Sequence, residues 1–178
     1  MVKNVVVNLE ILEQMIYFWQ ASSEGEKVGE TYLTQIAENK DMALLYDDEY
    51  NAASVRKVLS AITNREQMNA PTKREWKLWN NNMWVMEEKL VLDNMVRPVK
   101  LLNVDALAEK LNAQKDIPYE RLEILFYPGT TEEYLVHENK LLINFFRINA
   151  DLFDEEKVSI EGRPVSDYVE ERLLEVDG

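Results

Sequence analysis

The sequence contains no cysteine, one histidine and five glycines, and each scarcity excludes a class of chemistry. Without cysteine the chain cannot form disulfides, thiolate nucleophiles, iron–sulfur clusters or zinc sites with sulfur ligands. The glycines do not stand at the spacing of a dinucleotide-binding loop, a P-loop or a nucleophile elbow. The familiar phosphate-binding loops and serine-hydrolase sites are therefore excluded.

Long apolar runs are also missing. A membrane-spanning helix needs about 20 apolar residues, whereas the most apolar short stretch, residues 15–19, is bounded by Gln14 and Gln20. The first residues do not resemble a secretory signal, because Glu10 interrupts them before an apolar segment can form. Together with the absence of cysteine, these features predict a cytoplasmic protein without a membrane partner.

Negative charge is in clear excess. The chain has 33 acidic and 20 basic residues, for a net charge of −13. Such a field repels phosphate backbones and attracts basic proteins, although it also simply keeps a protein in solution. We therefore expect no nucleic-acid partner, and among protein partners we expect basic ones.

Helical spacing of apolar residues dominates the first part of the chain, up to about residue 115. Asn8 is a candidate N-cap for the first helix, and Ser23 with Glu26 is a candidate capping box for the second. Thr72 followed by Glu75 is the clearest capping box. We expect five helices, over residues of about 9–22, 28–36, 51–62, 72–96 and 105–112.

The period changes to strand spacing after Pro118. Residues 121–126 alternate, residues 134–137 and 140–148 predict a hairpin around Glu138, and a short strand and a helix follow over 158–160 and 165–176. Helices first and strands afterwards are typical of the α+β class. We therefore predict one α+β domain over residues 1–178, with a helical layer over about 1–115. A small, mainly antiparallel sheet and a closing helix would occupy about 116–178.

The helix expected over 72–96 has apolar residues on several sides. One apolar stripe has residues spaced alternately three and four apart, and it consists of Trp76, Trp79, Met83, Met86 and Leu90. A second row, with residues seven apart, consists of Leu78, Val85 and Leu92. Such a helix is either central to the domain or covered by a partner, so truncating Trp79 or Leu90 to alanine should cost about 2–5 kcal/mol. The candidate interaction surface consists of Trp76, Trp79, Met83, Trp84, Met86 and Leu90. The simplest way to cover the remaining faces is a homodimer.

Candidate catalytic groups are few. His137 is the only side chain that titrates near neutrality, and it lies at a predicted hairpin end without a suggestive neighbour. The acidic runs 47–49, 132–133 and 154–156 offer oxygen ligands, but none has the EF-hand pattern. Basic and aromatic residues mix over 73–79, as in a nucleic-acid surface, yet core packing also explains the two tryptophans there.

The leading hypothesis is a non-catalytic protein-interaction or regulatory module that uses no cofactor. The alternative is an enzyme of unfamiliar type, working through acidic residues with a divalent metal or through His137. No reaction can be assigned from these residues.

Because the sequence contains no recognisable set of metal ligands, a chelator should not change the stability of the protein. Thermal melting with and without EDTA measures this. A clear decrease of the melting temperature in EDTA would show that a structural metal had been missed.

Overall fold

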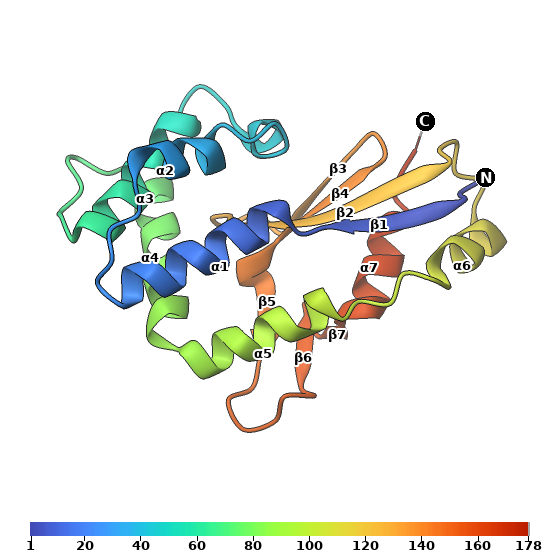
Figure 1. The fold of residues 1–178 in the computed structure, drawn as a ribbon. Helices are drawn as coiled ribbons and strands as arrows, with labels where there is room; N and C mark the ends of the chain where they lie inside the picture. Colours follow the sequence, from blue (N-terminus) through green and yellow to red (C-terminus); the bar gives the residue numbers. More distant parts are fainter. Residues whose placement is uncertain (178) are drawn as a thin grey trace. The chain divides into compact units, whose positions relative to one another are not determined.

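The computed structural model describes residues 1–177, which divide into two compact units (Figure 1). The helical unit comprises residues 10–89 and 128–132. Among the described residues, the sheet unit comprises residues 1–9, 90–127 and 133–177. The single domain predicted for the whole chain stays a prediction.

The helical unit contains four α-helices. They are α1 (Glu10–Ser23), α2 (Glu30–Ala37), α3 (Ala52–Asn64) and α4 (Lys73–Glu87), with a short 3-10 helix at Met42–Leu45. Helix α3 packs against both α2 and α4, and α1 packs against α4. Their shared core contains side chains with no exposed surface: Met15, Phe18, Leu33, Ile36, Val55, Val58, Leu59, Leu78 and Val85.

The sheet unit contains two sheets and three α-helices. The strands are β1 (Asn4–Asn8), β2 (Arg121–Tyr127), β3 (Tyr134–His137), β4 (Lys140–Asn144), β5 (Ile148–Ala150), β6 (Val158–Ile160) and β7 (Arg163–Pro164). The helices are α5 (Lys89–Lys100), α6 (Leu107–Gln114) and α7 (Val165–Leu173), and a 3-10 helix lies at Phe145–Arg147. The residue Lys89, at the start of α5, falls at the boundary with the helical unit.

The larger sheet has the strand order β1-β2-β4-β3. Strands β1, β2 and β4 are parallel, and β3 is antiparallel to β4. Parallel strands are usually covered on both faces, and the side chains of Leu122, Ile124, Leu141 and Ile143 are completely buried. The smaller sheet, β5-β6-β7, is antiparallel.

These elements confirm the predicted α+β class, the small antiparallel sheet near the C-terminus and the closing helix α7. The hairpin around Glu138 is also confirmed, with β3 ending at His137 and β4 starting at Lys140. Its second arm is shorter than predicted, because β4 ends at Asn144 and a 3-10 helix follows over Phe145–Arg147. Among the described residues, no helix combines the length and the apolarity of a membrane span.

Two predicted helix starts are wrong. Asn8 is the last residue of β1, a strand that the helical pattern beginning at Leu9 concealed, and α1 starts at Glu10. Ser23 is the last residue of α1, and α2 starts only at Glu30 with Gly29 as its N-cap. The positive φ of +83° at Gly25, which glycine adopts without strain, turns the chain between the two helices.

The single helix predicted over 72–96 is also wrong, because α4 ends at Glu87 and α5 begins at Lys89. Glu88 leaves the helical conformation with φ −106° and ψ 62°. Pro98 does not end α5, which continues to Lys100. Pro98 has no backbone N–H, so α5 lacks the hydrogen bond that this position would donate to the carbonyl of Asn94.

The division at Glu88 changes which side chains are in the core. Leu90 is 65% exposed, so the prediction that the chain buries it is wrong, whereas Leu78 and Val85 of α4 are completely buried. Leu78→Ala should therefore lower the free energy of unfolding by about 2–5 kcal/mol, and Leu90→Ala by less than about 0.5 kcal/mol. Urea unfolding midpoints measure both. Equal shifts for the two variants would contradict this placement of α4 and α5.

Candidate functional site

Helix α4 begins at the capping box that the sequence predicts. The Thr72 hydroxyl accepts a hydrogen bond from the backbone N–H of Glu75 at 3.1 Å, and Glu75 Oε1 accepts one from the backbone N–H of Thr72 at 2.9 Å. The same carboxylate lies 3.0 Å from Nζ of Lys57 on α3. These contacts fix both the first residue of α4 and the side of the helix that faces α3.

The buried face of α4 is half polar. Besides Leu78 and Val85 it contains Glu75 and Asn82, which are 5% and 0% exposed. The Asn82 Oδ1 accepts a hydrogen bond from Nε1 of Trp19 at 2.7 Å, and its Nδ2 donates one to the carbonyl of Leu78 at 2.8 Å. A buried amide is tolerated when its hydrogen bonds are made, so Asn82 anchors α4 to α1.

The aromatic and methionine side chains of α4 are consequently left at the surface. Trp76 and Trp84 are 46% and 47% exposed, and Trp79, Met83 and Met86 are half-buried. The rings of Trp76 and Trp79 meet edge to face, with their centroids 5.5 Å apart. Five of the six residues of the predicted interaction surface therefore share one helix.

Leu90, the sixth predicted residue, lies on α5 in the sheet unit. There it borders a hollow of about 560 Å³ together with Leu152, Phe153 and several acidic side chains. Phe153 is 93% exposed. The sequence analysis placed Leu90 with the tryptophans only because it assumed one continuous helix.

A groove in the helical unit lies where α1 and α3 end beside the second half of α4. It has a volume of about 520 Å³. The side chains that line it are Ser22, Ser23, Ala61, Ile62, Arg65, Glu66, Gln67, Trp79, Met83, Met86 and Glu87. Its volume lies within the 300–1,000 Å³ typical of binding pockets, and its apolar part comes mainly from α4 and from the last turn of α3.

Two helix ends shape this groove. The chain leaves α3 through Arg65, whose φ of 56° is in the left-handed region. The Arg65 Nη2 lies beside Gly25, only 3.7 Å from where a Cβ on that glycine would stand. The turns that follow α1 and α3 thus lie together, and the acidic residues Glu24 and Glu26 flank Gly25 in the chain. The charged side chains that line the groove are Arg65, Glu66 and Glu87, so acidic groups outnumber basic ones there.

The sequence analysis missed the contributions of α1 and α3 to this groove. Ala61 and Ile62 belong to an ordinary apolar helix face, and Ser22 and Ser23 were interpreted as a helix boundary. No local pattern distinguishes a groove-lining residue from a core residue. The exposed methionines Met83 and Met86 were the available signal, since methionine is frequent at adaptable binding surfaces.

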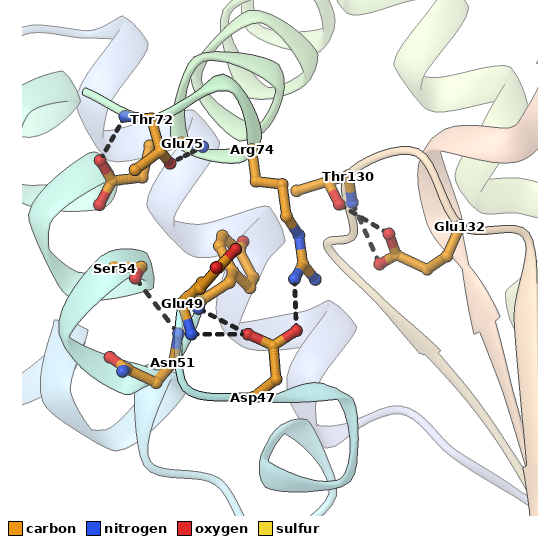
Figure 2. A network of polar contacts seen from close by, with 10 residues as sticks. Asp47, Glu49, Asn51, Ser54, Thr72, Arg74, Glu75, Thr130 and Glu132 are labelled. Atoms are coloured by element: carbon orange, nitrogen blue, oxygen red, sulfur yellow. Dashed lines mark hydrogen bonds and ion pairs between the residues drawn. The ribbon is translucent and has the colours of Figure 1, made fainter.

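A second polar cluster holds the turn before α3 against the start of α4 (Figure 2). The Asp47 carboxylate accepts hydrogen bonds from the backbone N–H groups of Glu49 and Tyr50, both at 2.8 Å, and from Nη1 of Arg74 at 2.9 Å. The Arg74 guanidinium also lies over the Tyr50 ring, 4.2 Å from its centroid. The backbone hydrogen bonds, more than the arginine, lower the pKa of Asp47. The arrangement is that of a structural clamp.

The candidate catalytic groups are not brought together. His137, 45% exposed by its side chain, has Glu138 Oε1 3.8 Å from its Nε2. Asp47 is engaged in the clamp, and Glu132 accepts hydrogen bonds from the hydroxyl and the backbone N–H of Thr130 at 2.6 and 3.2 Å. Within residues 1–177, no three acidic or histidine side chains form a group that could hold a metal ion. The described residues therefore offer no assembled metal centre.

Comparison with known proteins gives no assignment: the chain matches no protein-family model, no curated protein and no solved structure.

Burial in the helical unit has a consequence at high pH. Burial raises the pKa values of Tyr46 and Tyr50 well above the ordinary value of 10.0, and the nearby acidic Glu132 and Glu75 add to the effect on Tyr50. Since the folded-state pKa exceeds the unfolded one, this stability is present below pH 10 and is lost as the pH rises above it. Tyr46 and Tyr50 should ionise only when the chain unfolds.

An alkaline titration followed by phenolate absorbance and by far-UV circular dichroism tests this. We expect a late phase of ionisation that coincides with the loss of helicity, and Tyr50→Phe should reduce its amplitude by one tyrosine. Reversible ionisation of all eight tyrosines without loss of helicity would contradict the burial of these two phenols.

Proposed function

We propose that this protein is a non-catalytic interaction module, and that the groove of its helical unit receives the apolar face of an amphipathic, basic helix from another protein. The observation that carries the proposal is the lining of the groove by Trp79, Met83 and Met86, which the helical unit leaves partly exposed. An amphipathic helix inserts large side chains spaced three and four residues apart into such grooves.

The methionines suit this role physically. The methionine side chain is unbranched and polarisable, so Met83 and Met86 can repack around anchors of different shape. Trp79 supplies a large rigid surface, and tryptophan is enriched among the residues that contribute most to binding. A groove of this composition binds by apolar contact and needs few directional polar groups.

The expected charge of the partner follows from the charge around the groove. Residues 10–89 and 128–132 contain 15 acidic and nine basic side chains. Glu66 and Glu87 belong to the groove lining, and Arg65 is the one basic residue there. A basic partner gains favourable long-range attraction, which increases its association rate at low salt. An acidic helix of the same apolar pattern is repelled.

The enzyme alternative has less support. With a metal ion it would require several acidic or histidine side chains around one point, and within residues 1–177 no group of three is found. His137 has the acidic Glu138 3.8 Å from its Nε2, and both side chains are largely exposed. A cytoplasmic location belongs to the proposal, because a chain without cysteine fits a reducing compartment.

A model peptide tests the proposal directly. The probe is a labelled peptide of about 18 residues with leucine on one helical face and lysine on the other. Fluorescence anisotropy should show binding in the range of about 1–100 µM, weakening as salt increases. A scrambled peptide of the same composition and a peptide with glutamate in place of lysine should bind at least about tenfold more weakly.

A pair of variants separates insertion into the groove from simple charge attraction. Met86→Glu places a carboxylate in the groove, and Leu101→Glu makes the same charge change at an exposed position of the sheet unit. Insertion predicts about a tenfold loss of affinity for Met86→Glu alone. Charge attraction predicts a slight gain for both. A gain or no change with Met86→Glu, in a variant that keeps its helicity, would refute the groove as the binding site.

A further inference from the structure

Helix α4 has a third face, which neither the core nor most of the groove uses. The outer stripe, as we define it, consists of Lys73, Trp76, Asn80, Trp84 and Glu87. At 100° per residue, the spacings of three, four, four and three place these five side chains on one side of the helix. All five are exposed in the structure.

The outer stripe is complementary to a second, antiparallel copy of itself. Asn80 is its midpoint, Trp76 and Trp84 stand four residues to either side, and Lys73 and Glu87 stand seven residues to either side. Two such helices paired antiparallel would therefore place each tryptophan opposite a tryptophan and each lysine opposite a glutamate. A parallel pair would instead place like charges together.

We propose that the outer stripe of α4 binds the outer stripe of a second copy of this chain, antiparallel, about a twofold axis at Asn80. With a rise of 1.5 Å per residue, the two tryptophan pairs lie about 12 Å apart along the helix, between ion pairs about 21 Å apart. The two Asn80 amides meet at the axis, where a polar side chain can fix the register of paired helices. An interface of this kind contacts itself, as a twofold dimer requires.

The size of the surface sets the expected strength. A tryptophan buries 150–250 Å² when fully enclosed, and each of the four rings begins about half exposed. Tryptophans and flanking residues of one helix pair therefore bury less than the 1,200–2,000 Å² of a stable interface. We expect a reversible dimer with a dissociation constant of about 10–100 µM.

The outer stripe adjoins the groove but uses different side chains. Trp79, Met83 and Met86 line the groove, whereas Glu87 borders both surfaces and the Trp76 ring of the stripe meets the Trp79 ring edge to face. Sedimentation of the protein alone tests the dimer, and Lys73→Glu should not weaken peptide binding in the groove, because the added negative charge attracts the basic peptide. The two experiments can therefore refute the dimer and the groove partner separately.

Charge exchange gives the sharpest test. Lys73→Glu and Glu87→Lys each replace two attractive pairs by two repulsive ones, and each should weaken the dimer by about ten- to thirtyfold. Both changes suit the helix itself, because a negative charge at its start and a positive charge at its end favour the helix dipole. Loss of the dimer would therefore not reflect unfolding. Arg56→Glu, on the exposed side of α3, makes the same charge change as Lys73→Glu away from the stripe and should have no effect.

Sedimentation velocity over about 5–500 µM, at low salt, decides the question. We expect a dimer for the wild type and Arg56→Glu, and monomers at about 50 µM for Lys73→Glu and for Glu87→Lys. The double variant should dimerise again, and an equimolar mixture of the two single variants should form a heterodimer. A wild type that stays monomeric at about 500 µM, or single variants that dimerise like the wild type, would overturn the proposal. A mixture that remains monomeric would overturn it equally.

Discussion

The helical unit depends on two polar side chains in the buried face of α4. Glu75 and Asn82 occupy positions that an ordinary amphipathic helix would give to leucine or valine. Each is satisfied there, Glu75 by the Thr72 backbone and Lys57, and Asn82 by Trp19. Removing one partner of such a buried contact costs more than the contact itself contributes. These residues therefore determine which side of α4 faces inward.

The other sides of α4 follow from that orientation. Once Glu75, Leu78, Asn82 and Val85 face α1 and α3, the tryptophans and methionines can only face the groove or solvent. Large apolar residues on a soluble surface mark interaction sites when they gather in one place. The groove and the outer stripe are the two surfaces that result. Their different charge patterns are the reason that we propose different partners for them, a basic helix for the groove and a second copy for the stripe.

Local patterns in the sequence predicted those parts of the fold that local physics determines. The capping box at Thr72, the hairpin at Glu138 and the order of helices before strands all depend on residues close in the chain. The strand β1 was missed because its partner β2 lies more than a hundred residues later, where Val5 pairs with Leu122. The break between α4 and α5 at Glu88 was missed because no glycine or proline stands beside it to predict the end of a helix.

The candidate site was predicted for a reason that the structure corrects. The apolar stripe that ends at Leu90 has the spacing of a buried helix face. It therefore predicted that a single helix over residues 72–96 would be covered by other elements or by a partner. Periodicity detects a face but does not identify which face is buried, because that depends on partners distant in sequence. Trp19 stands 63 residues before Asn82, and no local pattern relates them. The tryptophans remain candidate contact residues because they are exposed, and not because they are central.

Hydrogen exchange of the four tryptophan indoles tests most directly whether α4 exposes the face that contains Trp76 and Trp84. Trp19 is 2% exposed and its indole N–H is bonded to Asn82, so NMR of the dilute, monomeric protein should show slow exchange for that one signal. The indole signals of Trp76 and Trp84, which are about half exposed, should exchange rapidly. Slow exchange at Trp76 and Trp84 together with rapid exchange at Trp19 would show that α4 buries the opposite face, and would contradict both binding surfaces.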